Sequence, residues 1–157
     1  MNQTELRIIL TNVYKNKLSP ADAIKQLQNM PYENIDFAKI DHHRELRSGL
    51  PEVIYGQGKS IIQLKKIIRS LKNANSDTLA TKLSSDTYKK LKTSLPKDAK
   101  YNEQAQTLVI RNKKIKQSVG LITIVTAGTS DIPIAEEAAV TADLLGSRVE
   151  TIYDVGV

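Results

Sequence analysis

The sequence predicts an α/β protein in three parts: a small helical N-terminal segment, a mixed α/β N-terminal domain, and the start of a second domain with a parallel sheet. Three observations predict this. Apolar residues recur at helical spacing in residues 4–14. Short strand-like runs alternate with helical patterns between residues 52 and 110. From residue 120 onward, a strand, a turn of small residues, a helix and a second strand follow one another, as in a parallel β-α-β unit.

Composition indicates a globular chain and argues against a membrane protein. Hydrophobic residues make up 40% of the 157 residues, and no apolar run approaches the roughly 18 residues that a membrane span needs. Met1–Leu10 is too polar for a secretory signal, and there is no cysteine, so we expect a cytoplasmic location. The net charge of +6 divides into +11 for residues 1–119 and −5 for residues 120–157. This step predicts a boundary between domains 1–117 and 118–157.

Residues 1–30 are predicted to form a helical hairpin. The first helix covers residues 4–14. Ser19 is expected to cap the second, with Pro20 at its first position, and Met30-Pro31 to end it. The following residues 35–50 are polar and predicted to be irregular, anchored by Ile35, Phe37 and Ile40.

Ionisable residues concentrate within this irregular stretch. His42 and His43 are adjacent and therefore point apart, so a shared metal ion is not expected. Arg44 and Arg47, spaced i and i+3, are placed to contact one phosphate or carboxylate together. The alternative is an Arg–Asp41 pair that only fixes the segment.

Residues 52–71 predict a strand, a glycine turn and a helix. Gly58-Lys59-Ser60 is similar to the end of a phosphate-binding loop, but Val53 occupies the position where that motif needs a further glycine, which argues against an NTPase. Lys59 remains a candidate anion contact at the helix N-terminus, with Glu52 as its candidate partner. Downstream we expect a strand at 78–81, a helix at 86–94, a hairpin with strands 99–102 and 107–110, and a basic connector at 111–118.

The C-terminal part begins with the apolar run Leu121–Val125, predicted to be a fully buried parallel strand. A turn, Thr126–Asp131, leads into a helix that has Pro133 in its first turn and ends at Gly146. A second strand is expected from Val149 to Val155.

The turn has two interpretations. Asp131 is placed to cap the helix by accepting a hydrogen bond from the Ile134 N–H. Alternatively, the turn binds an anion or phosphate, as strand ends that feed a helix N-terminus often do.

A resemblance favours the second interpretation. The residues that carry it are Thr126-Ala-Gly-Thr-Ser-Asp131, Pro133, Ala135-Glu-Glu-Ala-Ala139, Thr141-Ala142, Gly146, Asp154-Val-Gly-Val157 and, upstream, Asp41, Arg44, Arg47, Gly49, Leu50-Pro-Glu-Val-Ile-Tyr55 and Gly58-Lys59. In this pattern the chain resembles the LarB family, whose catalytic half is similar to PurE and has a flavodoxin- or Rossmann-like three-layer fold. Two separated motifs in the same order make the resemblance specific from about residue 40 onward.

The resemblance implies an activity. Family members carboxylate the pyridinium ring of nicotinic acid adenine dinucleotide with CO2 or bicarbonate and cleave its phosphoanhydride. They release pyridinium-3,5-biscarboxylic acid mononucleotide and AMP in nickel-pincer cofactor biosynthesis. It further implies that Gly128, Thr129, Ser130, Asp131, Arg44, Arg47 and Lys59 bind this or an NAD-like dinucleotide. Asp131 would also contact magnesium, with no organic cofactor, and the complete PurE-like domain would form a homo-oligomer.

The chain departs from the family at one decisive point. It contains no cysteine, whereas a cysteine is thought to add to the pyridinium ring in the family. We therefore expect an N-terminal fragment that is inactive alone, with no catalytic residue of its own. The alternatives are a regulatory or oligomerisation module of such an enzyme and a relative of the PurE-type carboxylase. Nucleic acid is not an expected partner, because aromatic residues amount to only 4%.

Overall fold

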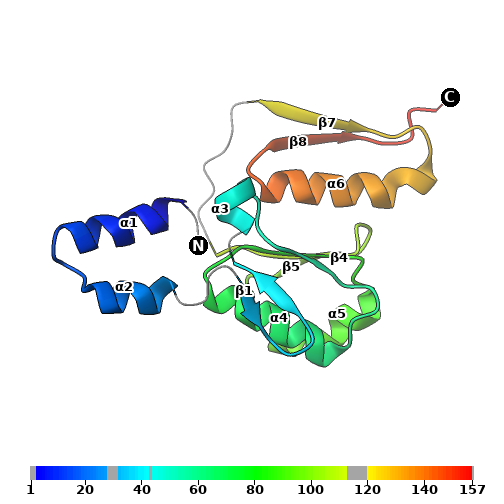
Figure 1. Ribbon diagram of the computed structural model, residues 1–157. Coiled ribbons are helices and arrows are strands. Elements are labelled where there is room, and N and C mark those ends of the chain that lie inside the picture. The colour runs from blue at the N-terminus through cyan, green and yellow to red at the C-terminus, as the bar shows by residue number, and fades with distance from the viewer. Residues whose placement is uncertain (1–2, 28–31, 43, 113–119, 157) are drawn as a thin grey trace.

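A computed structural model describes residues 3–27, 32–42, 44–112 and 120–156, without the side chains of residues 3, 46 and 47. The first two helices, α1 (Gln3–Tyr14) and α2 (Pro20–Leu27), form the predicted hairpin and extend away from the rest of the chain (Figure 1). Ser19 caps α2, since its Oγ accepts from the Asp22 N–H at 3.1 Å, and Pro20 is the first helical residue. The predicted end at Met30-Pro31 lies outside the described residues.

Residues 32–48 are more regular than the sequence suggested. Strands β1 (Tyr32–Asn34) and β2 (Lys39–Asp41) pair antiparallel, and α3 (Arg44–Ser48) follows. The prediction that residues 35–50 are irregular was therefore wrong. It failed because strands of three residues are too short to show an alternating pattern. Ile40 is buried in the core as predicted, whereas Phe37 is 39% exposed because it lies in the hairpin turn.

The central sheet has four strands in the order β3-β4-β6-β5. Strands β3 (Val53–Tyr55) and β4 (Thr78–Thr81) are parallel, and β6 (Thr107–Ile110) pairs antiparallel with both β4 and β5 (Lys100–Asn102). On one face lie α4 (Ile61–Asn73), α5 (Ser85–Leu91) and the 3-10 helix η1 (Lys92–Ser94) (Figure 1). The four strands and α4 were predicted to within two residues, whereas the single helix expected at 86–94 is instead α5 followed by η1.

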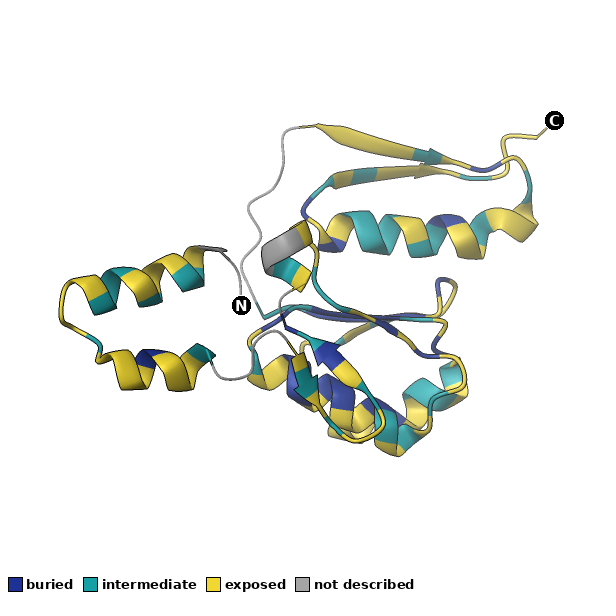
Figure 2. Ribbon diagram, viewed as in Figure 1, coloured by how far each residue is buried: buried dark blue, intermediate teal, exposed yellow. Residues whose placement is uncertain are grey.

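The main core lies between this sheet and the α4–α5 layer (Figure 2). Apolar residues at helical spacing on α4 place Leu64, Ile68 and Leu71 against the sheet, where they meet Leu108. Helix α4 starts with a capping box, in which the Ser60 Oγ accepts from the Gln63 N–H and the Gln63 Oε1 accepts from the Ser60 N–H.

The C-terminal part comprises β7 (Leu121–Val125), the 3-10 turn η2 (Thr129–Asp131), α6 (Ile132–Leu144) and β8 (Arg148–Ile152). Strands β7 and β8 are parallel, as predicted. Helix α6 lies between this strand pair and the central sheet, on the sheet face opposite α4 (Figure 1). Its residues Val140 and Leu144 pack on Leu79 and Val109.

Two expectations for this part need correction. Strand β7 is not fully buried: Leu121 is 52% exposed and Val125 is 56% exposed, because within the described residues β8 is its only strand neighbour and α6 covers one face. Strand β8 ends at Ile152, not at Val155. The predicted helix end at Gly146 is confirmed, since this glycine has a φ of 93° and its N–H donates to the Asp143 carbonyl. Among the described helices, none has the length and apolar character to cross a membrane.

Candidate functional site

The carboxyl ends of β3, β4 and β5 meet at one edge of the central sheet, because these three strands run in the same direction. The backbone there is closely packed. The Gly56 N–H donates to the Thr81 carbonyl at 2.7 Å, and a Cβ on Gly56 would lie 2.9 Å from the same oxygen. Glycine is therefore required where β3 leaves the sheet, and the loop that carries Lys59 starts from this fixed point.

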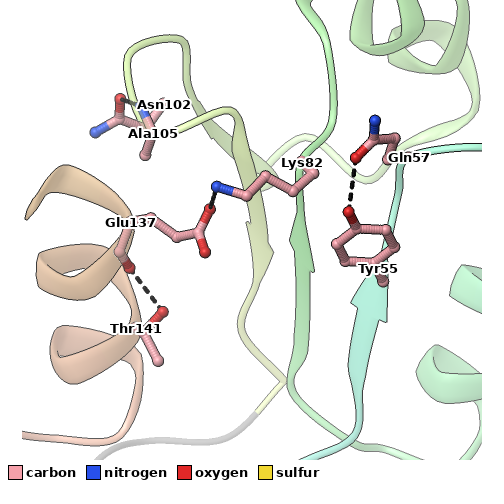
Figure 3. Close-up of polar contacts among 7 residues, drawn as sticks. All are labelled: Tyr55, Gln57, Lys82, Asn102, Ala105, Glu137 and Thr141. Carbon is pink, nitrogen blue, oxygen red and sulfur yellow. Dashed lines mark hydrogen bonds and ion pairs between the residues drawn. The ribbon is translucent and has the colours of Figure 1, made fainter. Parts of the chain in front are cut away.

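Helix α6 is held to this edge by two glutamates in its second turn. Lys82, which follows β4 in the left-handed backbone conformation, pairs with Glu137 at 2.9 Å between Nζ and Oε2 (Figure 3). Asn102, which ends β5, donates to Glu136 at 2.5 Å, and Tyr153 also donates to Glu136.

The other end of α6 is held at the opposite edge of the sheet. Arg111 follows β6, which runs the other way, and its Nη2 lies 2.5 Å from the Asp143 Oδ2. The N-terminus of α6, with the preceding turn, therefore lies at the carboxyl edge of β3 and β4.

The turn before α6 is braced by the segment that follows β8. Buried Thr126 accepts through its carbonyl from the Val155 N–H, and the Ala127 carbonyl accepts from the Gly156 N–H, both at 3.1 Å. Thr129, Ser130 and Asp131 are all exposed. The turn is thus fixed at its start, while its polar side chains face solvent.

The capping interpretation of Asp131 is wrong. Asp131 occupies the N-cap position, but its backbone is already helical and its side chain accepts no capping hydrogen bond. An N-cap carboxylate reaches back to the helix only from an extended backbone, and the 3-10 turn η2 prevents this. Asp131 instead borders an open hollow of about 370 Å³, which Ile124, Ala127 and Ala135 also line.

The structure places some of the predicted site residues at the same edge of the central sheet and others at the opposite edge. Gly128, Thr129, Ser130 and Asp131 precede α6 at the carboxyl edge, and partly buried Lys59 lies on the loop after β3 at the same edge.

The arginine pair lies elsewhere. Arg44 faces the start of β3, with its Nη1 4.0 Å from the Glu52 Oε2. Among the described contacts, Glu52 therefore pairs with Arg44 and not with Lys59. Arg44 belongs to the opposite edge, and the side chain of Arg47 lies outside the described residues.

His42 takes part in a hydrogen-bond network with Glu33 and Ser70. It is buried, and its Nε2 lies 3.0 Å from the Glu33 Oε2, which also accepts from the Ser70 hydroxyl. These hydrogen bonds tie the β1–β2 hairpin to α4, and together they hold the pKa of Glu33 below its usual value, with the Ser70 bond as the largest cause. His43 lies outside the described residues, in which no metal-binding cluster of His, Cys, Asp or Glu occurs.

Lys82 and Glu137, which pair at this edge, were not among the site residues predicted from the sequence. Lys82 directly follows a buried strand, and this signal marks a residue at a sheet edge. Its partner is 55 positions away along the chain, so no local pattern connects the two.

Comparison with known proteins identifies the family of the chain. A family model described as the LarB/PurE-like N-terminal domain matches residues 32–113, slightly more than half of the chain. An uncharacterized protein of Methanocaldococcus jannaschii is 39% identical over 160 residues, covering 97% of this chain. The chain spans 62% of the length of that relative. The match covers the central sheet with its α4–α5 layer and the loop that carries Lys59, and on this evidence the chain belongs to the LarB family.

Proposed function

We propose that this chain is the N-terminal part of a carboxylase/hydrolase that acts on nicotinic acid adenine dinucleotide. In the proposed reaction, CO2 or bicarbonate carboxylates the pyridinium ring and the phosphoanhydride is cleaved. The products are pyridinium-3,5-biscarboxylic acid mononucleotide and AMP. One observation carries the proposal: in a chain of the LarB family, an uncapped turn of Gly, Thr, Ser and Asp precedes α6 at the carboxyl edge of two parallel strands.

The turn suits the diphosphate of such a substrate. The first N–H groups of α6 and the positive end of its dipole favour an anion, and Gly128 has room for a close approach, since a Cβ there would meet only the Ser130 Oγ at 3.9 Å. Ser130 and Thr129 would donate hydroxyl hydrogen bonds, and Lys59 would contribute a positive charge from the neighbouring loop. These roles bind and orient the substrate and transfer no proton.

Asp131 would repel a phosphate unless a cation lay between them. Magnesium fits this position, because it is commonly held by one or two carboxylates together with substrate phosphate oxygens. The exposed, uncapped carboxylate of Asp131 is such a ligand. A magnesium ion bound there would neutralise charge on the phosphoanhydride.

Arg44 and Arg47 are assigned a different anion from the one bound by the turn before α6. Because Arg44 lies at the opposite edge of the sheet, the anion that the two arginines contact would belong to a neighbouring subunit of a homo-oligomer. The chain contains no cysteine, so we assign the covalent step to no residue of these 157 and expect no turnover by the chain alone.

The test uses the complete gene product that contains this chain. It is incubated with nicotinic acid adenine dinucleotide, bicarbonate and magnesium, and the products are identified by mass spectrometry. We expect the biscarboxylic mononucleotide and AMP to appear together. Asp131→Asn should lower the rate about tenfold or more, as loss of a charged contact does.

The matched control is Asp86→Asn. Asp86 is an exposed aspartate on α5, on the other face of the sheet, where it pairs with Lys89 at 3.8 Å. This variant should turn over at the rate of the unchanged protein. Absence of both products from the complete protein, or an equal loss in the two variants, would contradict the proposal.

A further inference from the structure

A second hollow lies on the face of the central sheet opposite α6. It is formed by the C-terminal two thirds of α4 and the segment after η1, and has a volume of about 430 Å³. Lys65, Ile68, Arg69 and Lys72 line it from α4, and Leu95 and Pro96 line it from the other side. Helix α4 and helix α6 are on opposite sides of the sheet (Figure 1), so this hollow is separate from the turn before α6.

The hollow combines three positive charges with an apolar floor. Lys65, Arg69 and Lys72 follow one another at i, i+4 and i+7, which places them on one side of α4, and all three are exposed. Ile68, between them, is 5% exposed and belongs to the main core. The lining contains no carboxylate, and within the described part of the chain none of the three cations pairs with an Asp or Glu.

Helix stability does not account for this arrangement. Lys72, in the last turn of α4, complements the negative end of the helix dipole, but Lys65 lies in the second turn and gains nothing from it. Like charges at i and i+4, such as those of Lys65 and Arg69, repel one another. Lys66 shows the ordinary alternative: it is exposed on the same helix, outside the hollow, with its Nζ 5.8 Å from the centre of the Phe37 ring.

We propose that this hollow binds a nucleoside monophosphate. The planar guanidinium of Arg69 suits a phosphate, and the two lysines add charge around it. Ile68, Leu95 and Pro96 provide an apolar surface for the base. The volume is in the range of small-molecule sites, roughly 300–1,000 Å³. A nucleic-acid strand fits less well, because the lining holds no aromatic side chain on which successive bases would stack.

The test is a titration of the isotope-labelled 157-residue chain with AMP, followed through backbone amide shifts by NMR. Saturable shifts are expected at Ile68, Lys72 and Leu95. Inorganic phosphate alone and adenosine alone should each bind more weakly than AMP, because each engages only half of the hollow. Arg69→Gln should weaken AMP binding at these amides about tenfold, whereas the control Lys66→Gln should leave it unchanged.

Several results would overturn the inference. They are the absence of shifts at these amides, AMP shifts confined to residues 128–131, phosphate binding as tight as AMP binding, and equal weakening by Arg69→Gln and Lys66→Gln. The last result would show a general effect of surface charge. None of these outcomes depends on the carboxylation reaction, so the inference and the proposed function fail separately.

Discussion

Strands β6 and β7 have similar apolar sequences but opposite environments. All four residues of β6 are buried, whereas four of the five residues of β7 are exposed (Figure 2). Strand β6 lies between β4 and β5, with α6 packed on one face of the sheet and the α4–α5 layer on the other. Strand β7 pairs, among the strands that the structure describes, with β8 alone, and it has α6 on one face. An apolar run therefore identifies a strand, but its burial depends on the elements that surround it.

The largest expected effect on stability comes from a pair of substitutions that test this difference in burial. Leu108 in β6 is 0% exposed and Leu121 in β7 is 52% exposed. Leu108→Ala should lower the free energy of unfolding by about 3 kcal/mol, through lost burial and the cavity left behind. Leu121→Ala removes the same atoms from a half-exposed position and should cost less than about 1 kcal/mol. Urea unfolding followed by circular dichroism measures both.

Comparable losses of unfolding free energy in Leu108→Ala and Leu121→Ala would contradict the contrast between β6 and β7. They would mean that the outer face of β7 is covered in solution, so that Leu121 is buried there as deeply as Leu108. A concentration dependence of the Leu121→Ala midpoint would then identify a second copy of the chain as the covering partner.

Helices α4 and α6 begin differently, which adds a second difference between the central sheet domain and the C-terminal part. Ser60 caps α4 through the reciprocal bonds with Gln63, whereas Asp131 makes no capping bond to α6. Ser60→Ala should therefore destabilise the chain by about 1 kcal/mol. Asp131→Ala should change stability by less than about 0.5 kcal/mol, as a surface substitution does. The same urea titration compares them, and an equal loss would show that the Asp131 carboxylate is structural and not reserved for a ligand.

Local patterns in the sequence predicted the elements of the central sheet well. The strand at Thr78–Thr81 and the hairpin strand at Thr107–Ile110 were both confirmed, because buried β-branched runs with clear turn residues between them are unambiguous. Short elements and relations between distant segments were not predictable. Strand β1 is too short to show a period, and the exposure of β7 depends on which elements surround it.

In the candidate site, too, local motifs could be recognised in the sequence but the relations between distant segments could not. The turn at Gly128–Asp131 and Lys59 were identified as local motifs, and the structure places both at one edge of the molecule. Arg44 also belongs to a recognisable motif but lies at the other edge, because Glu52 holds it at the start of β3. Local motifs thus indicated candidate residues, while strand direction determines which of them lie at the same edge of the sheet.

The smallest expected effects are changes of stability with pH. They should appear at acid pH for Glu33 in the N-terminal part and at alkaline pH for Tyr153 in the C-terminal part. Glu33 ties the β1–β2 hairpin to α4, and its hydrogen bonds with Ser70 and His42 lower its pKa from the ordinary 4.5. That stabilisation is present above about pH 4.5 and is lost as the pH falls through the lower folded pKa. Tyr153, beside Glu136, has its pKa raised from the ordinary 10.0, first by burial and then by the Glu136 hydrogen bond. Its contribution is complete below about pH 10 and is lost as the pH rises through the raised folded pKa.

Two substitutions separate these contributions. Glu33→Gln keeps an acceptor oxygen for Ser70 but does not titrate, so its free energy of unfolding should fall less steeply than that of the unchanged chain between about pH 5 and pH 3. Tyr153→Phe should flatten only the alkaline side, above about pH 10. Urea unfolding across both ranges gives the slopes. If Glu33→Gln left the pH dependence of the free energy of unfolding unchanged on the acid side, the hydrogen bonds of Glu33 with Ser70 and His42 would contribute nothing to it. The loss of stability at acid pH would then arise from groups other than Glu33.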